Sequence, residues 1–264
     1  MTTLSTRGIL VLTMTDGLTA RQTSLLKTII NEYISTAEAV GSENLDKKYN
    51  LGVSPATIRN EMASLTKAGY LKQPHTSSGR VPTPTAMKFY IDQLMEEKQM
   101  SLVDEVKAKE EVWDSRNEID DLMDEATQAL ASRTKSLAVS VLKDKDGASG
   151  GKNDKFWHAG HSYIFNNPEF AEISACQSLF SIFEELDKMD RLFFGFGTTS
   201  PLDVLFGEEL GWPELLSTGI VSTHFTIHGR PGAMGVIGPA RADYSTVIPI
   251  LRYFGNMIQE VANG

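Results

Sequence analysis

Two short amphipathic segments follow residue 17 of the chain. Apolar residues recur at helical spacing over 25–33, which predicts a helix, and Thr19 is placed to cap its first turn. A second, shorter helix is expected to begin with Ser42 as its N-cap and to turn Leu45 and Tyr49 inward. We therefore expect two helices that share one small core.

A third helix is predicted between Ser54, which can act as its N-cap, and Gly69, which stops it. Pro55 suits the first helical position, where a missing N–H costs nothing. At about 100° per residue, three apolar side chains fall on one side and should face the core: Ile58, Met62 and Leu65. The other sides carry small and polar residues: Ala56, Thr57, Arg59, Asn60, Ala63, Ser64 and Lys67.

The segment after the third helix is predicted to form a short hairpin. Residues 70–73 are typical of a strand, and 74–82 of a tight turn in which Gly79 allows a close backbone approach. Four polar side chains lie on this turn: His75, Ser77, Ser78 and Arg80. Three helices followed by such a hairpin indicate a winged helix-turn-helix.

The polar face of the third helix carries the side chains that DNA recognition uses. Asparagine pairs with adenine, arginine pairs with guanine, and alanine or threonine methyl groups contact thymine. The donors of the hairpin suit phosphates or a minor groove. We predict the following DNA-binding residues: Ser54, Ala56, Thr57, Arg59, Asn60, Ser64, Lys67, His75, Ser77, Ser78 and Arg80. The same architecture also serves as a protein-docking module, and that alternative stays open.

The remaining pattern predicts a mixture of helices and strands. The expected elements are a helix from Thr83 to about Lys98, a helix-rich region over 102–136, a strand over 136–142, a helix over 172–189, strands over 191–196, 220–228 and 233–237 with a turn at 230–232, and a closing helix over 246–261. The apolar face between Ile119 and Leu130 is explained either by packing on its own domain or by a dimer seam. Residues 143–155 lack large apolar side chains and are expected to form a flexible linker.

Charge is divided unevenly along the chain. The 264 residues carry a net charge of −9, yet residues 1–98 hold 11 Lys+Arg and 9 Asp+Glu, a balance of +2 that leaves −11 for the rest. A balance of +2 is weak for a nucleic-acid binder, so the DNA assignment depends on local geometry. The single cysteine excludes an intrachain disulfide framework and fits a reducing cytosol.

Several other kinds of site are disfavoured by their motifs. The run 195–199 lacks the third glycine of a dinucleotide fingerprint and the Gly-Lys of a P-loop. His158 and His161 have no third ligand nearby for a metal, and Cys176 is better explained as a small buried residue. No Gly-x-Ser-x-Gly elbow occurs. We therefore expect no enzyme, no catalytic residue, no metal and no cofactor.

Four N-terminal motifs closely resemble the heat-inducible transcription repressor family, HrcA. They are Gly-Leu-Thr-Ala-Arg-Gln at 17–22, Val-Gly-Ser at 40–42, Val-Ser-Pro-Ala-Thr-Ile-Arg-Asn-Glu-Met at 53–62 and Gln-Pro-His-Thr-Ser-Ser-Gly-Arg-Val-Pro-Thr at 73–83. The segments 165–170 and 235–244 are also similar to that family. The resemblance implies a repressor of heat-shock (chaperone) operons that binds an inverted-repeat operator as a homodimer. It also implies regulation by the GroEL chaperonin.

The resemblance further implies an α+β fold, with a winged helix-turn-helix, a helical connector and a GAF-like domain. Family members carry more strands and a dimerising insert where this chain has 143–155, so we expect a shortened member with a reduced GAF-like domain. The expected divisions are an extension (1–17), a DNA-binding domain (18–98), a connector and first strand (99–142), the linker (143–155) and the GAF-like domain (156–264). The apolar run at 9–12 is too short for a signal peptide or a membrane span. We expect a cytoplasmic, nucleoid-associated protein; a ligand-responsive or protein-docking winged-helix regulator is the alternative.

Overall fold

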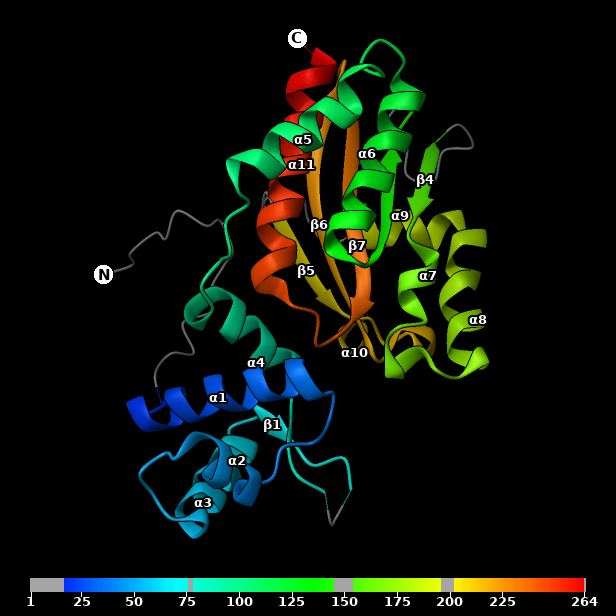
Figure 1. The fold of residues 1–264 in the computed structure, drawn as a ribbon. Coiled ribbons are helices and arrows are strands. Elements are labelled where there is room, and N and C mark those ends of the chain that lie inside the picture. The colour runs from blue at the N-terminus through cyan, green and yellow to red at the C-terminus, as the bar shows by residue number, and fades with distance from the viewer. Residues whose placement is uncertain (1–16, 76–77, 145–153, 196–201, 264) are drawn as a thin grey trace, which may run out of the picture. The chain divides into compact units, whose positions relative to one another are not determined.

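The computed structural model describes residues 17–75, 78–144, 154–195 and 202–263. They divide into two compact units, one ending at Glu96 and the other beginning at Glu97 (Figure 1). Each unit has its own core.

The first unit has three helices, a two-stranded hairpin and a closing helical segment. Its elements are α1 (Ala20–Thr36), α2 (Ser42–Tyr49), α3 (Pro55–Lys67), β1 (Leu71–Lys72), β2 (Val81–Pro82), α4 (Pro84–Phe89) and a π-helical turn, η1 (Tyr90–Leu94). Strands β1 and β2 pair antiparallel. An isolated bridge between Val40 and Arg80 joins the hairpin to the segment before α2. This is the predicted winged helix-turn-helix.

Local sequence explains how these helices begin. The Thr19 hydroxyl accepts from the N–H of Gln22, whose side chain in turn accepts from the Thr19 N–H. The Ser54 hydroxyl accepts from the Thr57 N–H, and Pro55 occupies the first turn. Both predicted caps are confirmed. The α3 residues expected in the core are buried: Ile58, Met62 and Leu65.

Two expectations for α2 were wrong. Gly41 occupies the N-cap position, and Ser42 is the first helical residue, buried and without a capping bond. The Tyr49 side chain is 37% exposed and does not join the core, because its hydroxyl donates to the Glu32 carboxylate on α1 at 2.5 Å. The Tyr49 hydroxyl finds its partner on a neighbouring helix, which apolar spacing alone does not reveal.

The second unit is a five-stranded antiparallel sheet with helices on both faces. Its helices are α5 (Leu102–Trp113), α6 (Ile119–Thr134), α7 (His161–Ile164), α8 (Ile173–Ser181), α9 (Leu186–Phe194), α10 (Gly207–Leu210) and α11 (Tyr244–Asn263), with short 3-10 turns η2 (Pro168–Phe170), η3 (Ile182–Glu184) and η4 (Pro213–Leu215). The strands are β3 (Leu137–Leu142), β4 (Lys155–Ala159), β5 (Leu202–Phe206), β6 (Thr218–Ile227) and β7 (Arg230–Pro239), in the order β4-β3-β7-β6-β5. The α+β class is confirmed.

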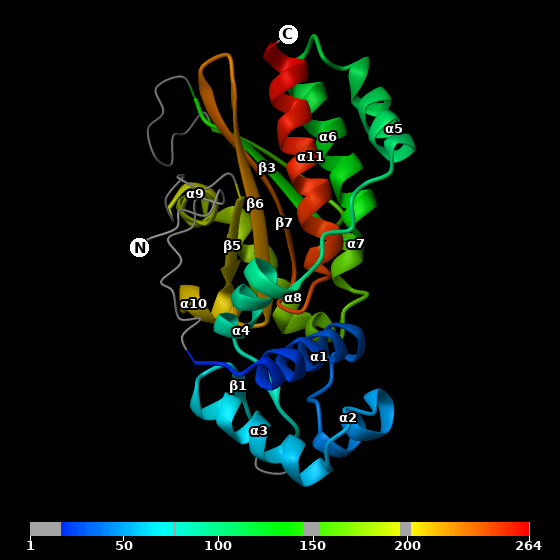
Figure 2. The ribbon, with the colours of Figure 1, turned by 90° about the vertical axis from the view of Figure 1, so that its left-hand side faces the viewer.

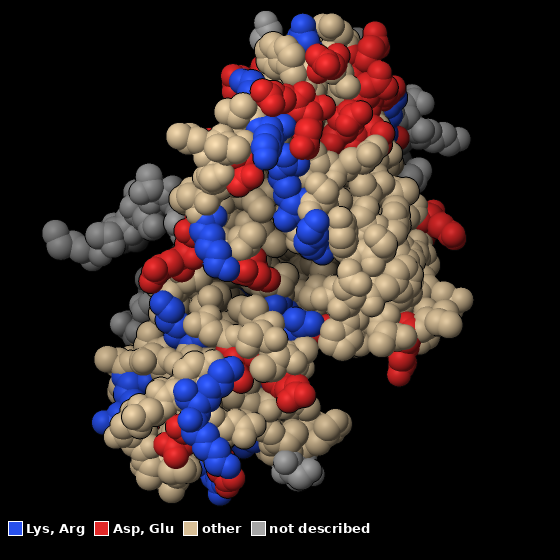
Figure 3. Space-filling view, viewed as in Figure 1, with Lys and Arg blue, Asp and Glu red and all other residues tan. Residues whose placement is uncertain are grey.

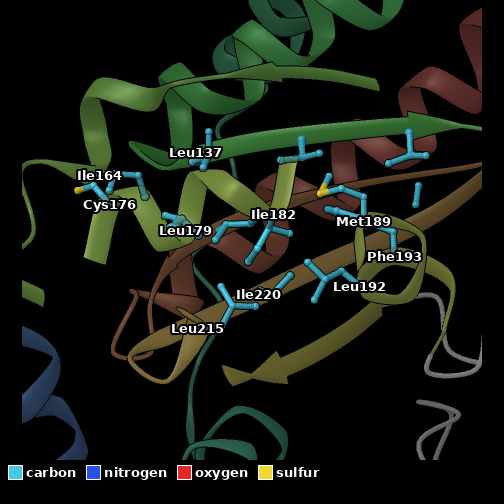
Figure 4. Packing of buried hydrophobic residues seen from close by; sticks show 14 of the residues in the cluster. Leu137, Ile164, Cys176, Leu179, Ile182, Met189, Leu192, Phe193, Leu215 and Ile220 are labelled. Carbon is cyan, nitrogen blue, oxygen red and sulfur yellow. The ribbon is translucent and has the colours of Figure 1, made fainter. Parts of the chain in front are cut away.

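Alternate residues of each strand serve opposite faces of this sheet. Leu137, Val139 and Val141 of β3 belong to a buried cluster with residues of α8 and α9 (Figure 4). On the other face, Ser140 hydrogen-bonds to Thr127 of α6 at 2.6 Å. Figure 2 shows α11 and α6 on one side of the sheet and α9 on the other. The second unit therefore has three layers.

The apolar face of α6 is covered within its own unit. Ile119 at the start of the helix is partly buried, and four further apolar residues of this face are fully buried: Leu122, Met123, Ala126 and Leu130. Packing on the unit's own sheet and on α11 therefore explains this face, and the dimer-seam interpretation does not apply to it. The helix-rich region also breaks into α5 and α6 between Asp114 and Glu118.

The predicted strand at 191–196 was wrong, because α9 runs through Phe194; Phe196 lies outside the described residues. Met189, Leu192 and Phe193 are buried whereas Arg191 is exposed, a spacing of three and four that suits a helix lying on a sheet. The predicted turn at 230–232 was also misplaced. His228 and Gly229 form it, with φ of 49° and 78°, and Arg230 already pairs with Ile227. Positive φ at both central residues is what a two-residue hairpin requires.

The linker expected at 143–155 is anchored at both ends. Lys143 is 4% exposed and forms ion pairs with Asp190 of α9 and, at 3.5 Å, with Asp154. Lys155 begins β4 and pairs with Asp120. Residues 145–153 lie outside the described part of the chain. Ion pairs therefore hold the ends of a segment that lacks large apolar side chains. Two strands that we did not predict, β4 and β5, complete the sheet.

Candidate nucleic-acid interface

The outer face of α3 is open to solvent within its own unit. Six of the predicted contact residues there are exposed: Ser54, Ala56, Arg59, Asn60, Ser64 and Lys67. Thr57 is partly exposed, and its hydroxyl lies 3.0 Å from that of Ser54. Because Ile58, Met62 and Leu65 hold the opposite face in the core, the helix presents small and polar groups outward on a rigid base.

Arg59 already has a carboxylate partner. Its guanidinium lies 4.0 Å from Glu43 at the start of α2, and both side chains are about 70% exposed, at 71% and 70% respectively. An ion pair this exposed is worth little and is easily exchanged. Arg59 can therefore exchange Glu43 for another anionic partner.

The hairpin, which we call the wing (residues 73–81), is closed by its own polar groups. The Ser78 hydroxyl accepts from the His75 N–H at 2.9 Å and donates to the His75 carbonyl at 2.7 Å. The Gln73 side-chain amide donates to the Ser78 carbonyl. His75 is exposed, and Ser77 lies outside the described residues. Ser78 therefore shapes the wing, whereas His75 is open at its surface.

Arg80 and Gly79 hold the base of the wing. The Arg80 backbone exchanges both hydrogen bonds with Val40, and its Nε donates to the Thr66 hydroxyl on α3 at 3.2 Å. A Cβ on Gly79 would lie 2.4 Å from the Val40 carbonyl oxygen. The close approach that we expected of Gly79 is therefore made to the chain's own backbone.

A groove of about 420 Å³ separates the wing from the helices. Its lining residues include two arginines and the first residues of α2: Ser42, Glu43, Asn44, Arg59, Met62, Gln73, Ser78 and Arg80. Three of these residues, Glu43, Asn44 and Gln73, were not predicted as members of this site. For Glu43 and Asn44 the signal was their place in the first turn of α2, where unpaired backbone N–H groups favour an anion.

Not every lysine of this unit adds to an attractive field for DNA. The Glu32 carboxylate accepts from Lys48 at 2.6 Å and from Tyr49, and these hydrogen bonds, that of Lys48 first, hold the pKa of Glu32 below its usual range. The positive charge of Lys48 is therefore paired with the negative charge of Glu32. In Figure 3 basic and acidic side chains are mixed on the winged-helix unit, whereas acidic side chains gather over α5 and α6.

The described ranges bear on other kinds of site as well. No group of three metal-binding side chains comes together in them. His158 and His161 contact each other edge to face with ring centroids 4.7 Å apart, and burial lowers the pKa of His161. Cys176 is buried, as expected. Across the same ranges, none of the helices combines the length and hydropathy needed to span a bilayer.

Known proteins resemble this chain over most of its length. A family model described as "HrcA protein C terminal domain" matches residues 76–248. The heat-inducible transcription repressor HrcA of Carboxydothermus hydrogenoformans is 26% identical over 333 residues, covering 91% of this chain and 97% of that protein. The protein of the same description from Clostridium acetobutylicum is 28% identical over 324 residues, covering 88% and 94%. Both alignments are longer than the 264 residues of this chain, so these relatives contain residues with no counterpart here.

A solved structure described as "Crystal structure of a hypothetical protein at 2.2 A resolution" shares the fold. It gives a TM-score of 0.74 at 18% identity and covers 93% of this chain and 98% of that one. The relatives are named as transcription repressors and not as enzymes, which confirms that this chain is of a regulatory class.

Proposed function

The chain belongs to the HrcA family, and from this premise we propose that it represses transcription of heat-shock (chaperone) operons by binding an inverted-repeat operator as a homodimer. Double-stranded DNA is the partner of the first unit, and a GroEL-type chaperonin is the partner that tunes the repressor's activity. The site of action is the cytoplasm, at the nucleoid.

One observation carries the proposal: α3 has a polar face that nothing in its own unit covers, and the wing stands beside it. Arg59 and Asn60 are the residues proposed to read bases, because both are exposed and carry donors of the right kind. Ala56 and the Thr57 methyl group are proposed to contact thymine. Ser54, Ser64 and Lys67 extend the same face toward the phosphates.

The wing residues have different proposed roles. His75 is exposed and is proposed to meet a phosphate or a minor groove, with Ser77 next to it in the chain. Ser78 and Arg80 are proposed to act at the groove, where Arg80 also keeps its contact with Thr66. The proposed surface thus combines base reading on α3 with positioning contacts from the wing.

The test is a fluorescence-anisotropy titration of the full chain against an inverted-repeat duplex from a chaperone promoter and a scrambled duplex of equal length. We expect tighter binding to the inverted repeat, with a steep fall as salt rises, because released counterions dominate such affinities. Addition of a purified GroEL-type chaperonin is expected to increase the fraction of protein able to bind. Equal, weak binding to both duplexes would favour the protein-docking or ligand-responsive alternative.

A further inference from the structure

Helix α5 has two apolar faces, and its own unit covers only one. Ala108 and Val112 are fully buried toward α6 and α11. On the other side Leu102, Val103, Val106 and Trp113 are 78%, 61%, 55% and 44% exposed. Figure 2 shows α5 outside α6 and α11. Among the described residues, half of the exposed large apolar side chains lie on this one 12-residue helix, which singles it out as an interaction surface.

The exposed residues have the spacing of a helix–helix seam. Positions 103, 106, 110 and 113 follow intervals of three, four and three, the a and d positions of a heptad, with Val103, Val106 and Trp113 apolar and Glu110 polar. A shallow depression of about 490 Å³ lies along the second half of this seam, between Val106 and Trp113, and includes Lys109 and Glu110. The outer face of α5 is therefore shaped to receive another helix.

We propose that the outer face of α5 is the surface through which two copies of this chain associate, with the two helices antiparallel across a two-fold axis. An axis midway along the seam places Val103 opposite the partner's Trp113 and Val106 opposite the partner's Glu110. Lys107, next to Val106 in the chain, then lies near the partner's Glu110. Because each of these pairings occurs twice across the axis, one patch can bind its own copy, which an isologous dimer requires.

A second copy is the occupant that the proposed function calls for, and the inference rests on that function. An inverted repeat needs two winged-helix units related by a two-fold axis. Helix α5 begins at Leu102, shortly after the first unit ends at Glu96. In a dimer formed through α5, only a short stretch of chain therefore separates each winged-helix unit from the helix at the two-fold axis. The other long apolar face of this region, on α6, is already buried.

The size of the patch predicts a reversible dimer. Four large side chains from each copy form a small interface, and small interfaces are typical of transient association. A polar residue at one a position also lowers stability while it fixes the register. We therefore expect the dimer of the free protein to have a dissociation constant in the micromolar range or weaker. Two adjacent half-sites on one DNA should favour the dimer.

Sedimentation equilibrium of the full chain without DNA tests this directly. The wild type is expected to move from the mass of one chain toward twice that mass as concentration rises, and Val106→Glu is expected to weaken dimerisation by tenfold or more. Ile173→Glu is the matched control, because Ile173 is 76% exposed in the same unit but lies on α8, and it should dimerise as the wild type does. Circular dichroism of the three proteins shows whether each is folded.

Crosslinking tests the orientation. The chain's single native cysteine is buried, so introduced thiols are the accessible ones. A mixture of Val106→Cys and Glu110→Cys proteins should form mixed dimers with a short bismaleimide, whereas Val106→Cys alone should crosslink far less. The inference is overturned if the wild type stays monomeric at all concentrations, or if Val106→Glu dimerises as the wild type does. DNA binding by the wild type is read separately, so loss of the dimer and failure of the proposed function give different results.

Discussion

Arg59 and Asn60 are neighbouring exposed residues of α3 whose side chains end in hydrogen-bond donors. If they read bases, Arg59→Ala and Asn60→Ala should each cost about 1–3 kcal/mol on the operator and leave the affinity for scrambled DNA nearly unchanged. Anisotropy titration of both duplexes at one salt concentration measures this. Lys47→Ala on α2 removes an exposed charge from the same unit and should weaken both complexes equally. Equal losses for Arg59→Ala would mean that the arginine contacts only phosphate.

Glu43 is a carboxylate at the edge of a surface proposed to meet a polyanion. It lines the groove and lies 4.0 Å from Arg59. Glu43→Gln removes one negative charge and frees Arg59, so we expect operator affinity to rise a few-fold and the salt dependence to steepen. Glu38→Gln, an exposed acid outside the groove, serves as the comparison. Unchanged or weaker binding by Glu43→Gln would show that Glu43 holds Arg59 in a geometry that recognition needs.

Lys143 is a buried cation whose partners come from two other segments. It pairs with Asp190 and Asp154, and its Nζ lies 4.7 Å from the centre of the Phe194 ring. Lys143→Ala leaves buried carboxylates without their partner, so we expect a loss of about 3–5 kcal/mol in the free energy of unfolding of the second unit. Lys155→Ala breaks a pair whose side chains are 48% and 57% exposed and should cost about 1 kcal/mol or less. Urea unfolding followed by circular dichroism compares the two, and equal costs would contradict a structural role for Lys143.

At the scale of elements, the wing depends on one glycine that touches backbone. A Cβ at position 79 would meet the Val40 carbonyl oxygen, which no side-chain movement can relieve. Gly79→Ala should therefore disturb the bridge between Val40 and Arg80, lower the stability of the first unit by about 1–3 kcal/mol and weaken binding to every DNA. Thermal unfolding and anisotropy check the two effects. Gly41→Ala, where a Cβ meets nothing within 4 Å, should retain the wing's function.

Elements with strong local signals were predictable from the sequence. Capping residues and helical spacing located α1 and α3, and the polar side of α3 followed from the burial of Ile58, Met62 and Leu65. The second unit was less predictable. The apolar run at 191–194 suits a strand or a buried helix equally, and only packing on the sheet decides for α9.

Contacts between distant segments account for the rest of the differences. The ends of the 143–155 segment looked unable to join a core, because the groups that bury Lys143 lie far away in sequence, at Asp190. Within the candidate site, the exposure of Arg59 and Asn60 could be predicted, but the ion pair with Glu43 and the bridge between Val40 and Arg80 could not. Such pairings arise from tertiary placement, which periodicity and capping rules do not encode.

At the scale of the whole molecule, basic and acidic residues are distributed unevenly along the sequence. The first 98 residues are slightly basic at +2, whereas the rest carries −11. Acidic side chains over α5 and α6 would repel phosphates, so the proposed DNA contact falls to the winged-helix unit. The apolar outer face of α5 lies among those acids, which suits it to a protein partner and not to DNA.

The two surfaces should therefore be coupled through the dimer. Once one winged-helix unit occupies a half-site, α5 holds the second unit at a high effective concentration, so the inverted repeat is bound far more tightly than two separate half-sites. Val106→Glu should reduce affinity for the inverted repeat by about tenfold or more, in line with its effect on the dimer, while leaving affinity for a single half-site duplex unchanged, and Ile173→Glu should alter neither. Titration of the three proteins against both duplexes gives the result. A parallel loss on the half-site would show that α5 acts on the fold of the DNA-binding unit, whereas full retention on the inverted repeat would place the two-fold contact elsewhere in the chain.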